Sequence, residues 1–385
     1  MLPYRFVIFI PIFVFVKFHK TMKKTLFPIA AIALSLAACN STPKFTVNGT
    51  IAGETAGNVI LVKQADQKLD TLAKAAIAEG KFVLSGTVNE LTDAYLMIEG
   101  KRGAMPIFLE NTVYTATLNM NDPAGNKIEG TANQKLYNDF MAINTEIKKK
   151  QSELYKAYGE ASQAEDKEKM AQIEADFNKA AEDGAAKADA LIKANADSYV
   201  AAYMVASQMG GLEFEDLQAK YELLGANAKA TQPGKMIGDR IQKLAAVAIG
   251  KVAPDFTLNT PEGKPLSMHS IKAKVKVIDF WASWCGPCRG ENPNVVAMYK
   301  ELHPKGLEIL SVSLDNDKDA WLKAIKDDNL TWNHVSDLKG WGCEAAQLYG
   351  VNGIPHLVVL DENNVIVAKN LRGEALKAKV AELLK

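Results

Sequence analysis

Two cysteines placed where a strand pattern passes into a helix pattern restrict the fold of this chain more than any other feature. Val275–Phe280 predicts a buried strand, Cys-Gly-Pro-Cys follows at 285–288, and Gly290–Leu302 predicts a helix. Two cysteines three positions apart in a first helical turn lie on one face, within the usual Cα separation of a disulfide, about 4.4 to 6.8 Å. The pair can therefore alternate between dithiol and disulfide without unfolding the chain around it.

The segment 250–385 alternates strand and helix patterns around this pair. Expected strands are Val275–Phe280, Leu307–Leu314, and a hairpin of His356–Leu360 with Val365–Lys369; expected helices are Gly290–Leu302, Asp317–Asp327 and Cys343–Tyr349. Such alternation is typical of a βαβ architecture. We therefore expect an α/β domain with a central sheet over 250–385.

The position of the cysteine pair favours redox chemistry with a separate role for each thiol. Cys285 is expected at the helix N-terminus, where unpaired backbone N–H groups and the helix dipole stabilise a thiolate. Cys285 is therefore the expected nucleophile toward a disulfide. Cys288, one turn into the helix, is the expected resolving thiol that breaks the mixed disulfide.

Other uses of the pair fit the sequence less well. A zinc site usually needs four ligands, and Cys343 and the five histidines form no second pair, so no metal is expected. Haem attachment needs a histidine after the second cysteine, where this chain has Arg289. A structural disulfide would constrain little chain entropy. Cys343 itself could be a third thiol near the site or a small buried hydrophobe.

Three motifs in this segment resemble the thioredoxin superfamily, and in particular its exported TlpA/ResA-like thiol-disulfide oxidoreductases. They are Ala253-Pro254-Asp255-Phe256, the stretch from Phe280 to Arg289, and the stretch from Tyr349 to Pro355. The resemblance covers about residues 250 to 385. It implies a thioredoxin-like fold with a mixed sheet, and a thiol:disulfide oxidoreductase that needs no cofactor beyond a redox-active Cys285–Cys288 disulfide.

The resemblance also implies roles for residues outside the pair. Asp279 matches a buried acid behind the active site, where burial raises the pKa of a carboxyl so that it can take the proton of Cys288. Pro355 matches a cis-proline that faces the cysteines and lets the backbone of Ile354 pair with an extended substrate. Glu291 matches a glutamate that would tune the cysteine pKa values. A solvated strand-end aspartate and a surface glutamate are the alternatives for the two acids.

Trp284, Gly286 and Pro287 complete the expected substrate-binding surface. The Gly-Pro dipeptide between the cysteines is that of thioredoxin, whose potential near about −270 mV is reducing. Reduction of disulfides in substrate proteins is therefore the expected direction. The electrons would come from a dithiol protein upstream, in the membrane.

The N-terminus carries two apolar runs, Phe6–Val16 and Leu26–Ala38, separated by four lysines. Each is too short for a transmembrane helix. The second run has the basic start, apolar core and small final residues of a secretory signal. We therefore expect an exported protein, with residues 1–38 as the signal region and Met22 as the true start.

The end of this signal, Leu36-Ala37-Ala38-Cys39, resembles the lipobox of bacterial lipoproteins. The resemblance implies lipidation of Cys39, followed by a linker over 39–44. The alternative is an incidental cysteine in an ordinary signal peptide. With the lipid, the protein would be anchored to a membrane of the cell envelope and face the periplasm.

Two further regions lie between the linker and the cysteine domain, so the chain is expected to be multidomain. Residues 45–131 contain short β-type runs separated by Gly, Asn and Asp, which predict a small antiparallel β domain. This region loosely resembles the domain of unknown function that precedes such modules in Bacteroidetes lipoproteins. Residues 132–249 are rich in Ala, Lys, Glu and Gln with helical periodicity, and predict a helical connecting region.

The charge balance argues against nucleic acid as a partner. Basic and acidic residues number 45 each, and removal of residues 1–38 takes away five basic groups and no acidic one. The mature chain is thus mildly acidic, whereas nucleic-acid binders usually carry a basic excess.

The expected function is a periplasmic thiol-disulfide oxidoreductase. Two alternatives stay open. A peroxiredoxin-like peroxidase would need a proline-containing motif before its cysteine, which Ala282-Ser283-Trp284-Cys285 does not supply. A binding or scaffold lipoprotein with an accessory redox domain is the second, because some 200 residues precede the cysteine pair without an assigned role.

Overall fold

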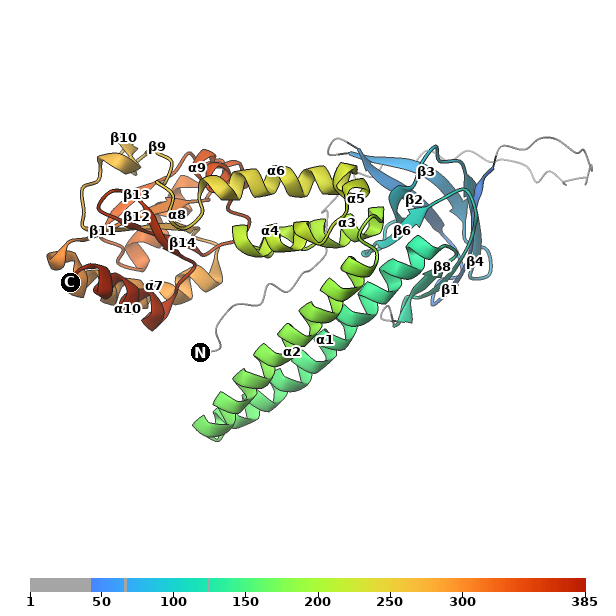
Figure 1. Cartoon of the computed structure of the whole chain (residues 1–385), viewed down its shortest axis with the longest axis horizontal. Helices are drawn as coiled ribbons and strands as arrows, with labels where there is room; N and C mark the ends of the chain where they lie inside the picture. Colours follow the sequence, from blue (N-terminus) through green and yellow to red (C-terminus); the bar gives the residue numbers. More distant parts are fainter. Residues whose placement is uncertain (1–42, 66–67, 123–124) are drawn as a thin grey trace, which may run out of the picture. The chain divides into compact units, whose positions relative to one another are not determined.

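A computed structural model describes residues 43–65, 68–122 and 125–385 (Figure 1). The chain divides into two compact units, with the boundary after Val200. The predictions about residues 1–38, Met22 and Cys39 lie outside the described residues. In the described part of the chain, no helix combines the length and the apolar character needed to cross a membrane.

The first unit begins with two four-stranded sheets, ordered β4-β1-β7-β8 and β3-β2-β5-β6. The strands are β1 (Phe45–Ala52), β2 (Asn58–Ala65), β3 (Lys68–Ala76), β4 (Lys81–Gly86), β5 (Thr92–Ile98), β6 (Met105–Leu109), β7 (Val113–Asn119) and β8 (Lys127–Glu129). Alternate residues of β1, β4 and β7 are buried, and they join residues of the other sheet in one apolar core. The pairings are antiparallel as expected, except that β1 and β7 run parallel.

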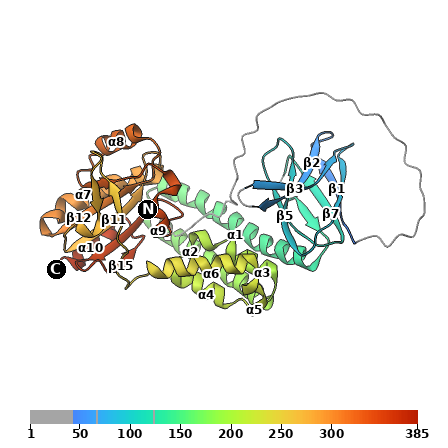
Figure 2. The ribbon, with the colours of Figure 1, turned by 90° about the horizontal axis from the view of Figure 1, so that it is seen from above.

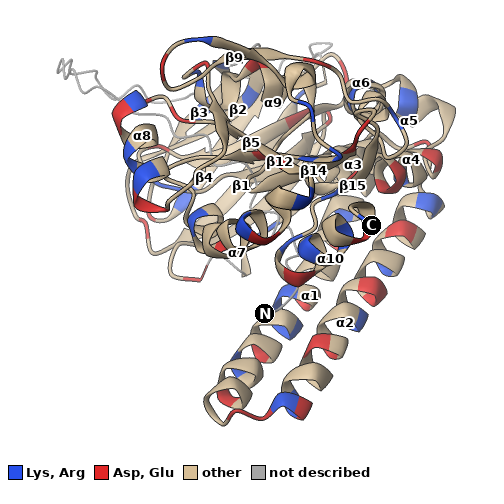
Figure 3. Ribbon diagram, turned by 90° about the vertical axis from the view of Figure 1, so that its left-hand side faces the viewer, with Lys and Arg blue, Asp and Glu red and all other residues tan. Residues whose placement is uncertain are grey.

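Two long helices, α1 (Ala132–Gln163) and α2 (Lys167–Ala194), complete the first unit and pack against each other (Figures 1 and 2). The Thr131 side chain accepts the N–H of Gln134 and starts α1, and Asp166 does the same for Lys169 at the start of α2. Lysines and acidic residues alternate along both helices (Figure 3), which is typical of helix faces exposed to water.

The expected helical region 132–249 is divided between the units, because α1 and α2 belong to the first and the later helices to the second. These later helices are α4 (Phe214–Glu222), α5 (Ala226–Ala230) and α6 (Gln232–Ala246), preceded by α3 (Tyr199–Ala206) at the boundary and the 3₁₀ turn η2 (Met209–Gly211). Both α4 and α5 pack on α6. Glu213, just before α4, binds Lys369 and Asn370 of the cysteine-containing domain, so these helices are part of that domain's unit.

The second unit is built on a five-stranded sheet in the order β13-β12-β11-β14-β15. Its elements are β11 (Val275–Trp281), α7 (Gly286–Leu302), β12 (Leu307–Ser313), α8 (Lys318–Asp327), β13 (Asn333–Val335), α9 (Glu344–Leu348), β14 (His356–Asp361), β15 (Ile366–Lys369) and α10 (Gly373–Leu383), with a small hairpin of β9 (Thr257–Asn259) and β10 (Pro265–Ser267) before them. The 3₁₀ turns are η3 (Met268–Ser270), η4 (His303–Lys305) and η5 (Gly340–Gly342).

The sheet of the second unit is mixed, as expected. The strand β11 is parallel to β12, which lies beside it in Figure 2, and antiparallel to β14. Helices α7 and α10 pack together against the sheet (Figure 1). Every residue of the central strand β11 is buried, as is usual for a strand covered on both faces.

Candidate redox site

The cysteine pair lies at the junction of β11 and α7. Cys285 is the N-cap residue of α7, and its Sγ accepts the backbone N–H of Cys288 at 3.2 Å. The two cysteines form a disulfide with a Cα–Cα distance of 5.3 Å. Both are nearly buried, with exposed fractions of 4% for Cys285 and 2% for Cys288. The pair therefore lies at a helix N-terminus, where the partial positive charge stabilises a thiolate.

A buried carboxylate holds the loop that leads into the pair. Asp315, just after β12, accepts the Ser283 hydroxyl at 2.6 Å and the Ser283 backbone N–H at 3.0 Å. The hydroxyl of Ser313 also donates to Asp315, at 2.8 Å. Sequence reasoning missed Asp315, whose only signal is an acid directly after an apolar strand. These bonds fix the backbone just before Trp284.

An ion pair holds the other side of the loop. Arg289 binds Asp328 through two nitrogens, with Nη2 to Oδ1 at 2.7 Å, and its Nη1 donates to the carbonyl of Ser283 at 3.2 Å. Asn292 also donates to Asp328, at 2.6 Å. Arg289 therefore links the first turn of α7 to the loop before the cysteines, a role that the sequence did not predict.

Asp279 lies on β11, two residues before the strand ends, and its side chain is buried. Burial raises the pKa of Asp279 to about 6, a hydrogen bond from Ser311 acts to lower it, and the charge of Glu291 raises it. The carboxyl of Asp279 is thus poised to gain or lose a proton close to neutral pH. It is not a solvated strand-end aspartate.

Pro355 follows a cis peptide bond from Ile354 at the start of β14. Its side chain is buried, and its carbonyl accepts Nη2 of Arg372 at 3.0 Å. Ile354 is half-buried. The cis bond is as the resemblance implied, whereas the position of Pro355 facing the cysteines and the pairing of Ile354 with a substrate stay predictions.

Glu291, in the second turn of α7, accepts the backbone N–H of Gly373 at 2.6 Å through Oε1 and the Asn294 amide at 3.1 Å through Oε2. Gly373 is the first residue of α10, so Glu291 ties the start of that helix to α7. Its expected influence on the cysteine pKa values stays a prediction.

The exposed residues on either side of Cys285 carry no charge. Trp284 is 54% exposed and its ring lies 6.2 Å from that of Trp341, which is 45% exposed. Gly286 and Pro287 are exposed, whereas Trp281 is fully buried. Sequence reasoning missed Trp341, which comes from the η5 turn, far from the cysteines in sequence.

Cys343 is fully buried, and burial raises the pKa of its thiol to about 11. A thiol with a raised pKa forms little of the reactive thiolate at neutral pH. The geometry thus favours packing over a third redox role for Cys343.

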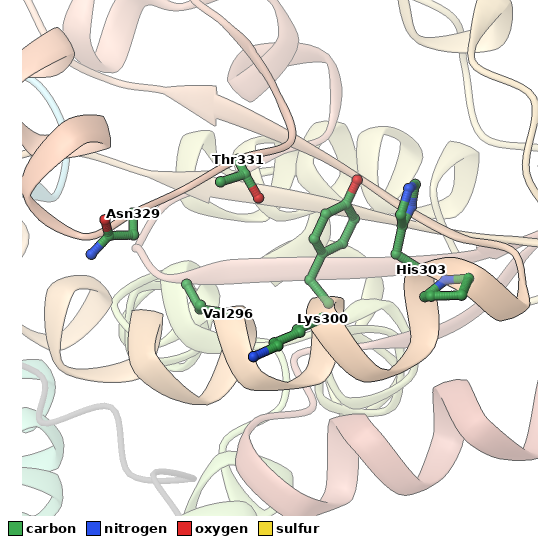
Figure 4. A pocket seen from close by; sticks show the side chains of 7 residues that line it. Val296, Lys300, His303, Asn329 and Thr331 are labelled. Atoms are coloured by element: carbon green, nitrogen blue, oxygen red, sulfur yellow. The ribbon is translucent and has the colours of Figure 1, made fainter.

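A cavity of about 320 Å³ lies at the far end of α7 (Figure 4). Tyr299, Lys300 and His303 line it together with residues of the loop before β13. None of the expected site residues takes part. Within residues 43–65, 68–122 and 125–385, no three His, Cys, Asp or Glu side chains are grouped as a metal site would require.

Comparison with known proteins accounts for both ends of the described chain. Residues 249–369 match a family described as the AhpC/TSA family, and residues 45–137 match a domain of unknown function, DUF4369. Over 137 residues the chain is 31% identical to the thiol-disulfide oxidoreductase ResA of Bacillus thuringiensis subsp. konkukian, covering 36% of this chain and 77% of the relative. The chain belongs to the ResA-like thiol-disulfide oxidoreductases.

The chain is also similar to three further proteins. The thioredoxin-like protein YneN of Bacillus subtilis is 33% identical over 128 residues, which cover 32% of this chain and 72% of that protein. The thioredoxin domain of a thiol-disulfide oxidoreductase from Bacteroides vulgatus is 35% identical, with 36% of this chain and 99% of that domain covered and a TM-score of 0.34. A thiol-disulfide oxidoreductase from Bacteroides fragilis is 36% identical, with coverage of 34% and 99% and a TM-score of 0.33.

Membership of the ResA-like oxidoreductases makes the chain an enzyme of thiol–disulfide exchange, and implies proteins with disulfides as its substrates. The matched stretch contains the cysteine pair, Asp279, Glu291 and Pro355. The relatives are named as oxidoreductases, which does not favour the peroxidase alternative.

Proposed function

We propose that this ResA-like enzyme reduces disulfides of exported proteins through its Cys-Gly-Pro-Cys pair, as a lipoprotein that faces the periplasm. The observation that carries the proposal is the Cys285–Cys288 disulfide at the N-terminus of α7. Such a pair exchanges two electrons with another disulfide and needs no further cofactor. The lipid at Cys39 and the periplasmic location rest on the sequence of the signal region.

In the proposed mechanism, the Cys285 thiolate attacks a sulfur of the substrate disulfide, and one substrate sulfur leaves as a thiolate. The Cys288 sulfur then attacks Cys285 in the mixed disulfide, while the Cys288 proton passes to Asp279 directly or through one water. The Cys285–Cys288 bond forms and the second substrate sulfur leaves with its electron pair. The substrate gains two electrons, and the enzyme is oxidised.

The surface beside the pair supports a polypeptide substrate. Trp284, Gly286 and Pro287 are exposed and uncharged next to Cys285, and Ile354 contributes backbone at the cis-proline. An extended segment could pair with this backbone as an added strand. A dithiol protein in the membrane would return the enzyme to its reduced form.

The test is reduction of insulin disulfides with dithiothreitol as the electron source. The wild type should accelerate the reaction, Cys285→Ser should lose this activity, and Cys343→Ser should keep it. Equal activity of wild type and Cys285→Ser would refute the proposal.

A second experiment identifies the substrate and the direction of electron flow. Cys288→Ala, expressed in the cell envelope, should hold substrates as mixed disulfides with Cys285, because the resolving thiol is missing. Mass spectrometry of the trapped species identifies the substrates.

A separate variant tests the lipid anchor. Cys39→Ser should move the protein out of the membrane fraction; if it stays there, Cys39 is not the anchor.

A further inference from the structure

Asp279 faces a specific partner on the next strand. The parallel register of β11 and β12 pairs Asp279 directly with Ser311. The Ser311 hydroxyl donates to Oδ2 of Asp279 at 2.9 Å, and both side chains are buried. Because neither side chain is open to bulk water, the hydroxyl is the polar group that stands in for solvent at this carboxyl.

Trp332 fixes the direction of that hydroxyl. It lies just before β13, and its indole N–H donates to Oγ of Ser311 at 2.8 Å. An indole nitrogen can only donate, so Ser311 must accept from it and can give its own proton to Asp279. The Trp332 ring is held in turn by Tyr299 and His334, with ring centroids 5.2 Å and 5.9 Å away. Hydrogen bonds thus run in one direction, from Trp332 to Ser311 and from Ser311 to the carboxyl of Asp279.

Among the described residues, none of the other titratable groups near these hydrogen bonds favours the ionised form of Asp279. Glu291 of α7 opposes ionisation of Asp279 through its charge. Burial lowers the pKa of His334 to about 4, so its ring is neutral above about pH 5. Burial raises the pKa of Tyr299 to about 12, so it too is neutral. Among these neighbours, Ser311 is the group that favours the ionised carboxyl.

We propose that Ser311 and Trp332 are positioning residues of the redox reaction, which keep Asp279 ionised and aimed as the acceptor of the Cys288 proton. The inference rests on the proposed function. In the resolving step the proton moves from Cys288 to Asp279 as the Cys285–Cys288 bond forms, the substrate sulfur leaves with its electron pair, and Asp279 then releases the proton to solvent. Without this donor, the buried carboxyl would stay protonated up to a higher pH and could accept the Cys288 proton only above it.

The experiment follows insulin reduction from pH 5 to 9 with dithiothreitol in excess, for the full chain and its variants. The wild-type rate should rise with a midpoint near the Asp279 value of about 6. Ser311→Ala should move this midpoint up by about one pH unit, because a hydrogen bond to an ionised group is lost. Trp332→Phe keeps an aromatic ring but frees the hydroxyl to rotate, so its midpoint should move the same way by less.

A second readout isolates the resolving step. Below pH 7, Ser311→Ala should accumulate more mixed disulfide than the wild type, as seen by acid quenching and mass spectrometry. In an Asp279→Asn background, Ser311→Ala should have no further effect on the pH profile. This non-additivity separates action through Asp279 from a general loss of stability.

Matched controls come from buried residues outside the chain of hydrogen bonds. Ser336→Ala removes a buried hydroxyl that bonds Ser313, and Trp321→Phe changes a buried indole of α8. Both should leave the midpoint unchanged, and circular dichroism checks that all variants fold. If Asp279→Asn abolishes the midpoint while Ser311→Ala and Trp332→Phe leave it in place, the inference is wrong and the proposed function stands. If Asp279→Asn itself leaves the midpoint in place, the role proposed for Asp279 is wrong as well.

Discussion

Among the described residues, the first unit buries one polar side chain, Gln134, whereas the second buries nine. The nine are Lys276, Asp279, Asn292, Ser311, Ser313, Asp315, His334, Ser336 and His356. Buried polar groups cost free energy unless partners satisfy them, so a fold keeps them where they are used. The first unit is held by an apolar core between two sheets. The second accepts polar groups in its core, and two of them, Asp279 and Ser311, belong to the proposed redox chemistry.

The two units can be followed separately because all five tryptophans belong to the second. Tryptophan fluorescence therefore reports unfolding of the second unit. Hydrogen–deuterium exchange of residues 43–200 reports on the first.

The largest effect is expected from Leu61→Ala in β2. Leu61 is fully buried in the core between the sheets, and loss of its side chain should destabilise the first unit by about 3 kcal/mol. Hydrogen exchange should show this loss, while tryptophan fluorescence and the rate of insulin reduction per folded molecule stay as in the wild type. A matching fall in that rate would mean that the first unit takes part in the reaction.

Asp279→Asn should stabilise the second unit at high pH, in contrast to the destabilisation of the first unit by Leu61→Ala. Because the folded-state pKa of about 6 lies above the ordinary value near about 3.9, Asp279 favours folding fully below pH 4, and this contribution is lost as the pH rises toward 6. The variant should therefore be more stable than the wild type by about 2 kcal/mol at pH 8, and hardly different at pH 4.

Denaturant unfolding at both pH values, followed by tryptophan fluorescence, measures this difference. The exposed residue Asp70 of the first unit provides the control, since Asp70→Asn should change nothing at either pH. An Asp279→Asn protein that is no more stable at pH 8 would contradict the view that this carboxyl is kept for chemistry at a cost in stability.

Ser283→Ala should destabilise the second unit, in contrast to Asp279→Asn in the same unit. It removes a donor from the buried Asp315 carboxylate, at a cost of about 1.5 kcal/mol in unfolding by denaturant. The rate of insulin reduction should fall as well, because the loop before Cys285 loses its anchor. The exposed Ser270→Ala is the control for both measurements. An unchanged rate would show that Asp315 serves folding alone.

The smallest effect is expected from an alanine at Gly290 in the second unit, and the same substitution at Gly49 in the first unit provides the contrast. At Gly290 in α7 a Cβ would meet no atom within 4 Å, so Gly290→Ala should stabilise the helix by about 0.5 kcal/mol. At Gly49 in β1 a Cβ would lie 1.9 Å from the Phe82 ring, so Gly49→Ala should destabilise the first unit. Fluorescence and hydrogen exchange should give these opposite signs. Stabilisation by Gly49→Ala would mean that the sheet core yields more easily than its packing indicates.

The sequence predicted the second unit in more detail than the first. Strands such as β11 and β12 are continuous apolar runs, which stand out from the helices between them. In contrast, β3 gives only a weak strand signal because its residues are mostly exposed and include Lys and Asp, and β8 has only three residues. The parallel pairing of β1 with β7 could not be predicted from the sequence either, because a local residue pattern does not indicate which strand pairs with which.

The same distinction applies to the site. Cys285, Cys288 and Asp279 lie within ten residues of one another, and a motif could point to all three. Ser311, Asp315 and Trp332 come from β12 and the segments that follow β12 and α8, and only the strand register and the fold bring them to the redox loop. Apart from the position of Asp315 after an apolar strand, the sequence carries no signal for them.

Gln134 has a mechanical consequence for the first unit. Its Oε1 accepts the backbone N–H of Phe108 in β6, and its Nε2 donates to Asn138 at 3.2 Å, so one side chain joins the sheet to the base of α1. The 32 residues of α1 extend about 48 Å from this joint. A rotation of about 5° there would displace the far end of the helix by about 4 Å, given that length. Gln134 shares this joint with Asn133 and Asn138, which donate to Glu110 and to the carbonyl of Ile128, so these three side chains together set the direction of the long helix.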